Sequence, residues 1–158
     1  MKKQKGFSLI ELLIVVAIIL IIAAIAIPNL LRSRMAANES SAVGSLRTLN
    51  TAEVAYSTTY PSVGFTGLAA LGGAAPCTAA VSTAACLVDN VLAASPFTKS
   101  GYTFSVTPGS QTPAVTYSST GYPQVLGQSG QRAFCSDQSG VIRANATAGT
   151  CATGDSPL

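Results

Sequence analysis

Residues 5–28 read KGFSLIELLIVVAIILIIAAIAIP, and this stretch decides how the chain is built. Between Phe7 and Ile27 the only polar side chains are those of Ser8 and Glu11. A helix rises 1.5 Å per residue, so this segment is about 31 Å long, close to the thickness of the hydrocarbon core of a bilayer. The stretch therefore predicts a helix that crosses a membrane.

The composition excludes several classes of function. The 158 residues contain no histidine, which excludes Ser-His-Asp catalysis and imidazole metal ligands. Nine Lys and Arg side chains are too few for the clustered basic face of a nucleic-acid-binding protein. No catalytic constellation is visible among the remaining residues. We expect a protein that is not an enzyme, binds no nucleic acid and needs no cofactor.

The apolar stretch has three alternative interpretations: a secretory signal, a permanent anchor, or a processed segment that keeps its apolar part. Lys2, Lys3 and Lys5 precede it and favour a cytoplasmic N-terminus with the rest of the chain outside. A secretory signal has an apolar core of about 7–15 residues, which is shorter than the stretch seen here. The sequence Ala23-Ala24-Ile25-Ala26 resembles a signal cleavage site, so that interpretation stays open.

Glu11 is the unusual residue of this segment. A carboxylate at the centre of a membrane helix costs about 2.5–3.5 kcal/mol on insertion scales, and such residues commonly have a function and a partner. The alternative is that Glu11 lies at headgroup depth, where its charge is hydrated. Placement alone does not explain why a basic segment, Gly6 and Phe7 come just before it.

The sequence Lys5-Gly6-Phe7-Ser8-Leu9-Ile10-Glu11 resembles the processing motif of type IV prepilins and of the related pseudopilins of type II secretion. The resemblance implies that a prepilin peptidase cuts between Gly6 and Phe7 and that the new Phe7 amine is N-methylated. It also implies that Glu11 acts in assembly and that Pro28 kinks the helix. Close resemblance extends to about residue 55.

Cleavage after Gly6 changes the charge of the segment. It removes three of the nine basic side chains, and the remaining six match the six acidic ones. A cationic amine at Phe7 and a carboxylate at Glu11 then share one apolar helix, where unpaired charges are costly. We expect Glu11 to pair with the Phe7 amine of a neighbouring subunit. Pairing within the first turn of the same helix is the alternative.

The helix is expected to continue well beyond the apolar stretch. No proline occurs between Pro28 and residue 57, and Gly44 is the only glycine there, so the helix is predicted to reach about Tyr56. Apolar side chains recur on one face of residues 29–57, with Glu53 inside the stripe, and this pattern predicts packing onto a globular head. The stripe comprises Met35, Ala42, Leu46, Leu49, Ala52 and Tyr56.

The composition changes after residue 57, where serine and threonine become frequent. Alternating patterns and turn residues predict an antiparallel sheet of three to five short strands. The expected strands are 102–106, 114–117, 130–135 and 141–144, preceded by short helical pieces at 67–71 and 86–94. The predicted fold class is α+β, with a long N-terminal α-helix, half membrane-spanning and half amphipathic, packed on a small antiparallel β-sheet head. The expected division is a leader at 1–6, a transmembrane or filament-core helix at 7–28, its amphipathic continuation at 29–57 and the head at 58–158.

Four cysteines lie in the exported part, where an even number favours disulfide bonds. Of the three possible connectivities we favour Cys77–Cys86 and Cys135–Cys151, because each closes a short loop. The absence of histidine and of any CxxC spacing argues against a metal site. Asp89, Asp137 and Asp155 are also too dispersed to predict a calcium site. The resemblance implies that the second pair staples the C-terminal segment to the sheet.

These observations predict a structural subunit of a type IV pilus-like filament, a helical homo-oligomer. The resemblance implies three partners besides the membrane: prepilin peptidase, an inner-membrane assembly platform and its cytoplasmic ATPase. The subunit is expected in the inner membrane with its head in the periplasm, and afterwards in an extracellular filament. One alternative is a pseudopilin of type II secretion or a low-abundance minor pilin. Another is a binding protein with a plain membrane anchor.

Overall fold

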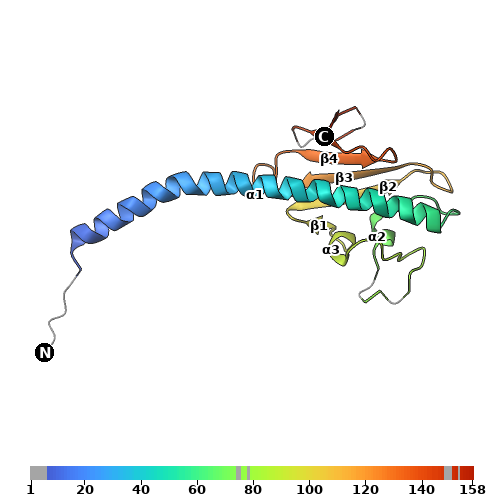
Figure 1. The fold of residues 1–158 in the computed structure, drawn as a ribbon, viewed down its shortest axis with the longest axis horizontal. Helices are drawn as coiled ribbons and strands as arrows, with labels where there is room; N and C mark the ends of the chain where they lie inside the picture. Colours follow the sequence, from blue (N-terminus) through green and yellow to red (C-terminus); the bar gives the residue numbers. More distant parts are fainter. Residues whose placement is uncertain (1–6, 74–75, 78, 148–150, 153) are drawn as a thin grey trace. The chain divides into compact units, whose positions relative to one another are not determined.

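The computed structural model describes residues 7–73, 76–77, 79–147, 151–152 and 154–158. The chain divides into two compact units, Met1–Arg34 and Met35–Leu158, which are described separately below. Gly6, predicted to be a processing residue, lies outside the described residues. The helix α1 (Leu9–Thr59) contributes to both units (Figure 1).

α1 contains the predicted membrane segment and the predicted amphipathic segment in one helix. Pro28 lies inside it, and because proline has no backbone N–H, the carbonyl of Ala24 loses its usual helical donor. The helix ends at Thr59, two residues beyond the predicted end at 57. Pro61 accounts for this end, because a proline disfavours helical geometry in the residue before it.

The second unit is built on a six-stranded antiparallel sheet whose strand order follows the chain, β1-β2-β3-β4-β5-β6. The predicted α+β fold class is confirmed. Two short helices, α2 (Leu68–Leu71) and α3 (Asn90–Ala93), precede the sheet (Figure 1). The strands are β1 (Thr98–Lys99), β2 (Tyr102–Pro108), β3 (Tyr117–Pro123), β4 (Ala133–Asp137), β5 (Arg143–Asn145) and β6 (Ser156–Pro157).

The prediction of a strand at 114–117 was wrong, because β3 only begins at Tyr117. Ala114 instead exchanges backbone hydrogen bonds with the loop after α1: its N–H donates to Val63 and its carbonyl accepts from Phe65. The inward positions of β3 are Tyr117, Ser119 and Gly121. Such polar or small residues leave no alternating hydrophobic pattern, which explains why this central strand was missed.

The helical piece expected at 86–94 is shorter in the structure, because α3 begins only at Asn90. Cys86 has a φ of 56°, in the left-handed region, which a right-handed helix cannot include. Asp89 then caps α3 by accepting a hydrogen bond from the backbone N–H of Leu92 at 2.7 Å. The cap sets the start of the helix later than the apolar pattern suggested.

The hydrophobic core lies between the second half of α1 and one face of the sheet (Figure 1). Gly121 allows close packing there, because a Cβ at this position would lie 3.0 Å from the ring of Phe104. Five of the six predicted stripe residues are buried, and Met35 is half-buried. The largest contributors are Leu46, Leu49 and Tyr56 from α1 and Tyr102, Phe104 and Phe134 from the sheet.

Replacing Leu49, which is fully buried, should destabilise the head. Leu49→Ala is expected to lower the free energy of unfolding by about 2–5 kcal/mol, because it removes apolar contacts and leaves a cavity. Thr51→Ala, at an exposed position of the same helix, should change it by no more than about 0.5 kcal/mol. Urea denaturation of the full-length chain in detergent, followed by tyrosine fluorescence, measures both. Equal losses would contradict the core assignment.

Candidate functional site

The N-terminal unit presents its predicted functional residues at the start of α1. Phe7 is the first described residue, with 78% of its surface exposed. Phe7 and Ser8 precede the helix, which begins at Leu9. Phe7, the residue predicted to follow the cleaved bond, therefore lies outside the helix.

Glu11 already has a partner in its own helix. The backbone N–H of Ser8 donates a hydrogen bond to Glu11 Oε2 at 2.9 Å, and the N–H of Leu12 donates to the Ser8 carbonyl. Ser8 thus stands at the N-cap and Glu11 at the third helical position, half of a capping box. Glu11 Oε1 forms no hydrogen bond with any described residue, so this oxygen retains its full capacity to accept.

The Ser8–Glu11 contact was missed in the sequence analysis, although Ser-x-x-Glu before an apolar run is a known capping signal. This contact uses the Ser8 N–H, and pairing of Glu11 with a Phe7 amine, in the same helix or in a neighbouring subunit, stays a prediction because Phe7 follows Gly6 in the uncut chain. One carboxylate oxygen is used for the cap. The other remains open for a partner from outside the chain.

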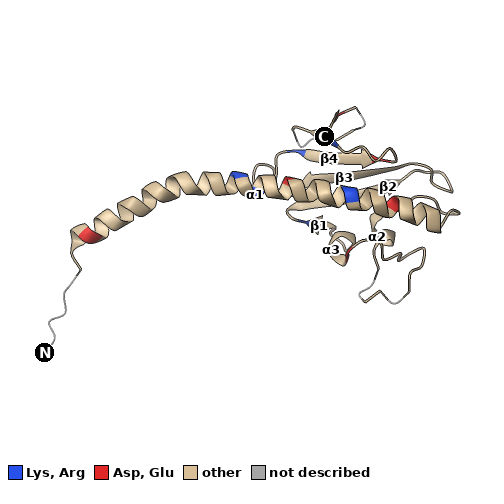
Figure 2. Cartoon of the chain, viewed as in Figure 1, with Lys and Arg blue, Asp and Glu red and all other residues tan. Residues whose placement is uncertain are grey.

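The surface that follows Glu11 is apolar and uncovered. Large apolar side chains from Phe7 to Leu31 expose between 46% and 79% of their surface. α1 contains an 18-residue window with a mean hydropathy of 3.3, of which none is buried, so it is long and apolar enough to span a membrane. In Figure 2 the ribbon of α1 is red near its start, where Glu11 lies, and carries no further charge colour until the blue position after the apolar stretch. A surface of this kind requires cover by lipid or by other apolar helices.

In the head, Glu39 joins α1 to the start of β4. Its Oε1 accepts hydrogen bonds from the backbone N–H groups of Gln131 and Arg132, at 2.9 and 3.2 Å. Its Oε2 pairs with the Arg132 guanidinium at 2.8 Å. Burial alone would raise the pKa of Glu39, but these N–H groups and the guanidinium outweigh it and hold the pKa below its usual value. The Arg132 guanidinium also lies 5.3 Å from the centre of the Phe134 ring.

Glu53, the carboxylate inside the predicted apolar stripe, has a different environment. It is fully buried, and its Oε2 accepts one hydrogen bond from the backbone N–H of Thr66 at 3.0 Å. Its Oε1 has no hydrogen-bond partner among the described residues. Burial raises the pKa of Glu53 to about 7, against the opposing effect of the Thr66 N–H. This carboxyl is therefore protonated in the folded head at mildly acidic pH.

Asn50 links α1 to the far end of the sheet. Its side-chain amide donates to Ser136 Oγ at 2.8 Å, and its carbonyl accepts from the Tyr117 hydroxyl at 3.1 Å. Burial, Glu53 and Asp137 together raise the pKa of Tyr117 to about 12. Asn50 and Arg132 are structural residues that sequence reasoning missed, since their partners lie about 90 positions away along the chain.

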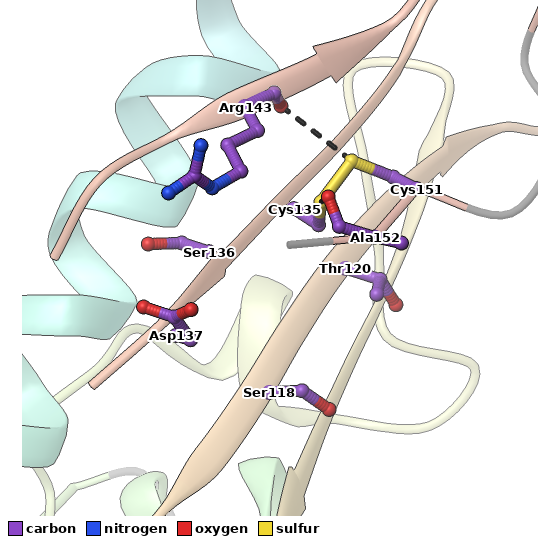
Figure 3. Close-up of a pocket in the computed structure, with 8 residues that line it drawn as sticks. All are labelled: Ser118, Thr120, Cys135, Ser136, Asp137, Arg143, Cys151 and Ala152. Atoms are coloured by element: carbon purple, nitrogen blue, oxygen red, sulfur yellow. Dashed lines mark hydrogen bonds between the residues drawn. A yellow bond between two sulfur atoms is a disulfide. The ribbon is translucent and has the colours of Figure 1, made fainter. Parts of the chain in front are cut away.

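The structure contains the disulfides Cys77–Cys86 and Cys135–Cys151, the two pairs favoured from the sequence. The second bond borders a hollow of about 110 Å³ on the sheet (Figure 3). Ligand pockets are commonly about 300–1,000 Å³, so this hollow is small for a substrate site. Asp155 lies within 4.8 Å of both sulfur atoms, but sulfurs bonded to each other are not thiolate metal ligands. The lining residues are Ser118, Thr120, Cys135, Ser136, Asp137, Arg143, Cys151 and Ala152.

Comparison with known proteins bears on the N-terminal site. Residues 1–27 match the family described as the prokaryotic N-terminal methylation motif. The chain is 62% identical over 40 residues to the type IV wide pilus major component PilA4 of Thermus thermophilus, covering 25% of this chain and 30% of that protein. It is 48% identical over 54 residues to the type IV major pilin protein PilA of Myxococcus xanthus, covering 34% of this chain and 24% of that protein.

The N-terminal segment of the chain is similar to the corresponding segments of two type IV pilins. The resemblance inferred from Gly6, Phe7 and Glu11 is confirmed at the level of the family motif. The chain spans less than a third of the length of each of these two pilins. No solved structure matches the chain.

The pKa of Glu53 predicts how the stability of the head depends on pH. The folded-state value of about 7 exceeds the ordinary value of 4.5, so the folded head binds this proton more tightly than the unfolded chain does. The resulting stabilisation is complete below pH 4.5 and is lost as the pH rises through 7. At about 1.4 kcal/mol per pKa unit, the loss amounts to roughly 3 kcal/mol.

Glu53→Gln removes the titrating group and should abolish this loss, so that the variant becomes more stable than the wild type at pH 8. Unfolding free energies of the full-length chain in detergent at several pH values between 4.5 and 8 measure the difference. Glu39→Gln is the matched control, because it removes a carboxylate of the same helix whose pKa is lowered. Between pH 4.5 and 8 its unfolding free energy should fall with rising pH as steeply as that of the wild type. If the unfolding free energy of Glu53→Gln falls with rising pH as steeply as that of the wild type, the assignment of the titrating group to Glu53 is refuted.

Proposed function

We propose that the chain is the structural subunit of a type IV pilus-like filament, assembled from the inner membrane through α1. The observation that carries this proposal is the uncovered apolar surface from Phe7 to Leu31, with a single carboxylate in its first turn. The match to the N-terminal methylation motif and the names of the two pilins support it. The role is mechanical and not catalytic.

In this proposal a prepilin peptidase cuts between Gly6 and Phe7, and the new Phe7 amine is methylated. The processed subunit then remains in the inner membrane, with its head in the periplasm, until it is assembled. An inner-membrane platform driven by a cytoplasmic ATPase moves subunits into the growing filament. Apolar α1 surface that leaves the lipid is buried again against other α1 helices, at about 25 cal/mol per Å².

Glu11 sets the register of a new subunit by pairing with the Phe7 amine of a neighbour. The open Glu11 Oε1 is available for this contact while Oε2 keeps the Ser8 N–H, so the helix does not uncap when the pair forms. In an apolar surrounding, a charged amine without its carboxylate costs about 3–5 kcal/mol. Each contact joins the Phe7 amine of one subunit to Glu11 of the next, so the two contacting surfaces differ. Such a heterologous interface produces an open helical filament.

Within the same family, a pseudopilin of type II secretion or a low-abundance minor pilin would use the same N-terminal chemistry. The two relatives are a wide pilus major component and a major pilin, which favours a surface pilus. A binding protein with a plain anchor would leave Gly6–Phe7 uncut and would have no use for Glu11.

Intact mass spectrometry under non-reducing conditions, on filaments sheared from cells, tests the processing. The expected species starts at N-methylated Phe7 and has four oxidised cysteines, because both disulfides form in the head. A processed chain that stays in the envelope and is missing from sheared material would favour the pseudopilin or minor-pilin alternative. A chain that begins at Met1 would contradict processing and favour the plain anchor.

Two substitutions at Glu11 separate its charge from its role as a cap. Glu11→Gln keeps an acceptor for the Ser8 N–H but loses the charge, whereas Glu11→Ala loses both. Both should reduce sheared filament at least about tenfold, because the lost pairing exceeds the 1.4 kcal/mol that corresponds to one factor of ten. The amount of processed precursor in the membrane should stay unchanged in both. Normal filament yield from Glu11→Gln would show that capping is the essential role and would overturn the pairing.

A further inference from the structure

Two exposed arginines, Arg32 and Arg34, follow the apolar surface of α1. Neither forms an ion pair with a described residue. The acidic residues that flank them along the chain are Glu11 and Glu39, and the Glu39 carboxylate is already occupied by Arg132. The two guanidinium groups are therefore cationic groups without an anionic partner, next to the segment proposed to cross a membrane.

The spacing along α1 places these arginines at the level of lipid phosphates. With Phe7–Ile27 filling the hydrocarbon core, Arg32 lies about 7 Å and Arg34 about 10 Å beyond its edge. The headgroup layer is about 5–7 Å thick on each side of a bilayer. Side chains of an α-helix lean toward its N-terminus, which here is the membrane side, and long arginine stems extend further toward the interface. The guanidinium groups therefore lie nearer the membrane than the backbone atoms of their residues, within the headgroup layer.

We propose that Arg32 and Arg34 bind the phosphate groups of anionic phospholipids in the outer leaflet of the inner membrane. This inference rests on the proposed function, since it requires that α1 spans the bilayer. A guanidinium offers planar, paired donors that match phosphate oxygens. The two side chains leave the helix about 200° apart, so they contact lipids on opposite sides of α1 and act independently.

After leader cleavage, the two arginines hold the processed subunit at the membrane surface. Before cleavage, Lys2, Lys3 and Lys5 hold the other end of the helix at the cytoplasmic surface. After cleavage, the Phe7 amine and the Glu11 carboxylate cancel, and the cytoplasmic end carries no net charge. The arginine pair is then the remaining electrostatic contact between the processed subunit and the membrane surface. A subunit that enters a filament must give up these phosphates.

Spin-labelled lipids test this contact directly. The full chain with Lys2, Lys3 and Lys5 replaced by glutamine, so that the inner end keeps only the Met1 amine and the Glu11 carboxylate, is reconstituted in phosphatidylcholine vesicles. Electron spin resonance then compares the share of spin-labelled phosphatidylglycerol and phosphatidylcholine that the protein immobilises. A basic residue near an anionic surface contributes about 1 kcal/mol, so each arginine should favour phosphatidylglycerol about fivefold. Arg32→Gln with Arg34→Gln should remove the preference.

Arg47→Gln is the matched control, because Arg47 is exposed on the same helix but lies about 20 Å further from the membrane. It should keep the full preference, and added salt should weaken the wild-type preference. A preference that survives the double substitution, or that falls equally in Arg47→Gln, overturns the proposal. Protease protection in the same vesicles reports insertion separately. A chain that does not insert refutes the proposed membrane stage itself, whereas insertion without lipid preference refutes only the arginine contact.

Discussion

The apolar surface of α1 between Phe7 and Leu31 is the constraint on which the rest of this protein depends. The described residues of the chain do not bury this surface, so water must be excluded by lipid or by other helices. Charges are accordingly confined to the two ends of the segment, with Glu11 at the start and the first arginine at position 32. A membrane-bound precursor and a helical bundle both satisfy this requirement, and a free monomer in water does not.

The head depends on the same helix for a different reason. Residues from Ala42 to Tyr56 form one wall of the core, and the part of the chain that the structure describes contains no other long helix to cover that face. Three polar side chains of α1 fix where the sheet lies against it. Glu39 binds the start of β4, Asn50 binds its far end through Ser136, and Glu53 binds the loop after the helix through Thr66.

Glu39 and Glu53 are identical carboxyl groups on one helix, and their surroundings shift their pKa values in opposite directions. Burial acts in the same direction on both. Glu39 receives two backbone N–H groups and a guanidinium, which favour its ionised form. Glu53 receives one N–H group and no cation among the described residues, so burial prevails and its neutral form is favoured. The first behaves as a permanent ion pair and the second as a group that titrates near neutral pH.

Local signals in the sequence were sufficient for the helix and for the N-terminal family motif. Phe7, Glu11 and Pro28 lie within one short segment, and the stripe from Ala42 to Tyr56 follows the helical period. The capping contact between Ser8 and Glu11 could have been predicted from the same local signals. The strand β3 could not, because its inward residues are tyrosine, serine and glycine. Pairing with β2 and β4 is what makes it a central strand.

By itself the sequence determined the α+β class, the long helix and its apolar segment, because these depend on spacing between residues that are close along the chain. The likeness to type IV pilins was also contained in it, in the segment around Gly6, Phe7 and Glu11. Only the tertiary structure decided that Arg132 holds Glu39 and that Glu53 is buried with one open oxygen. The physical reason is that desolvation and pairing depend on groups brought together from distant parts of the chain, and no periodic pattern in the sequence encodes such an encounter.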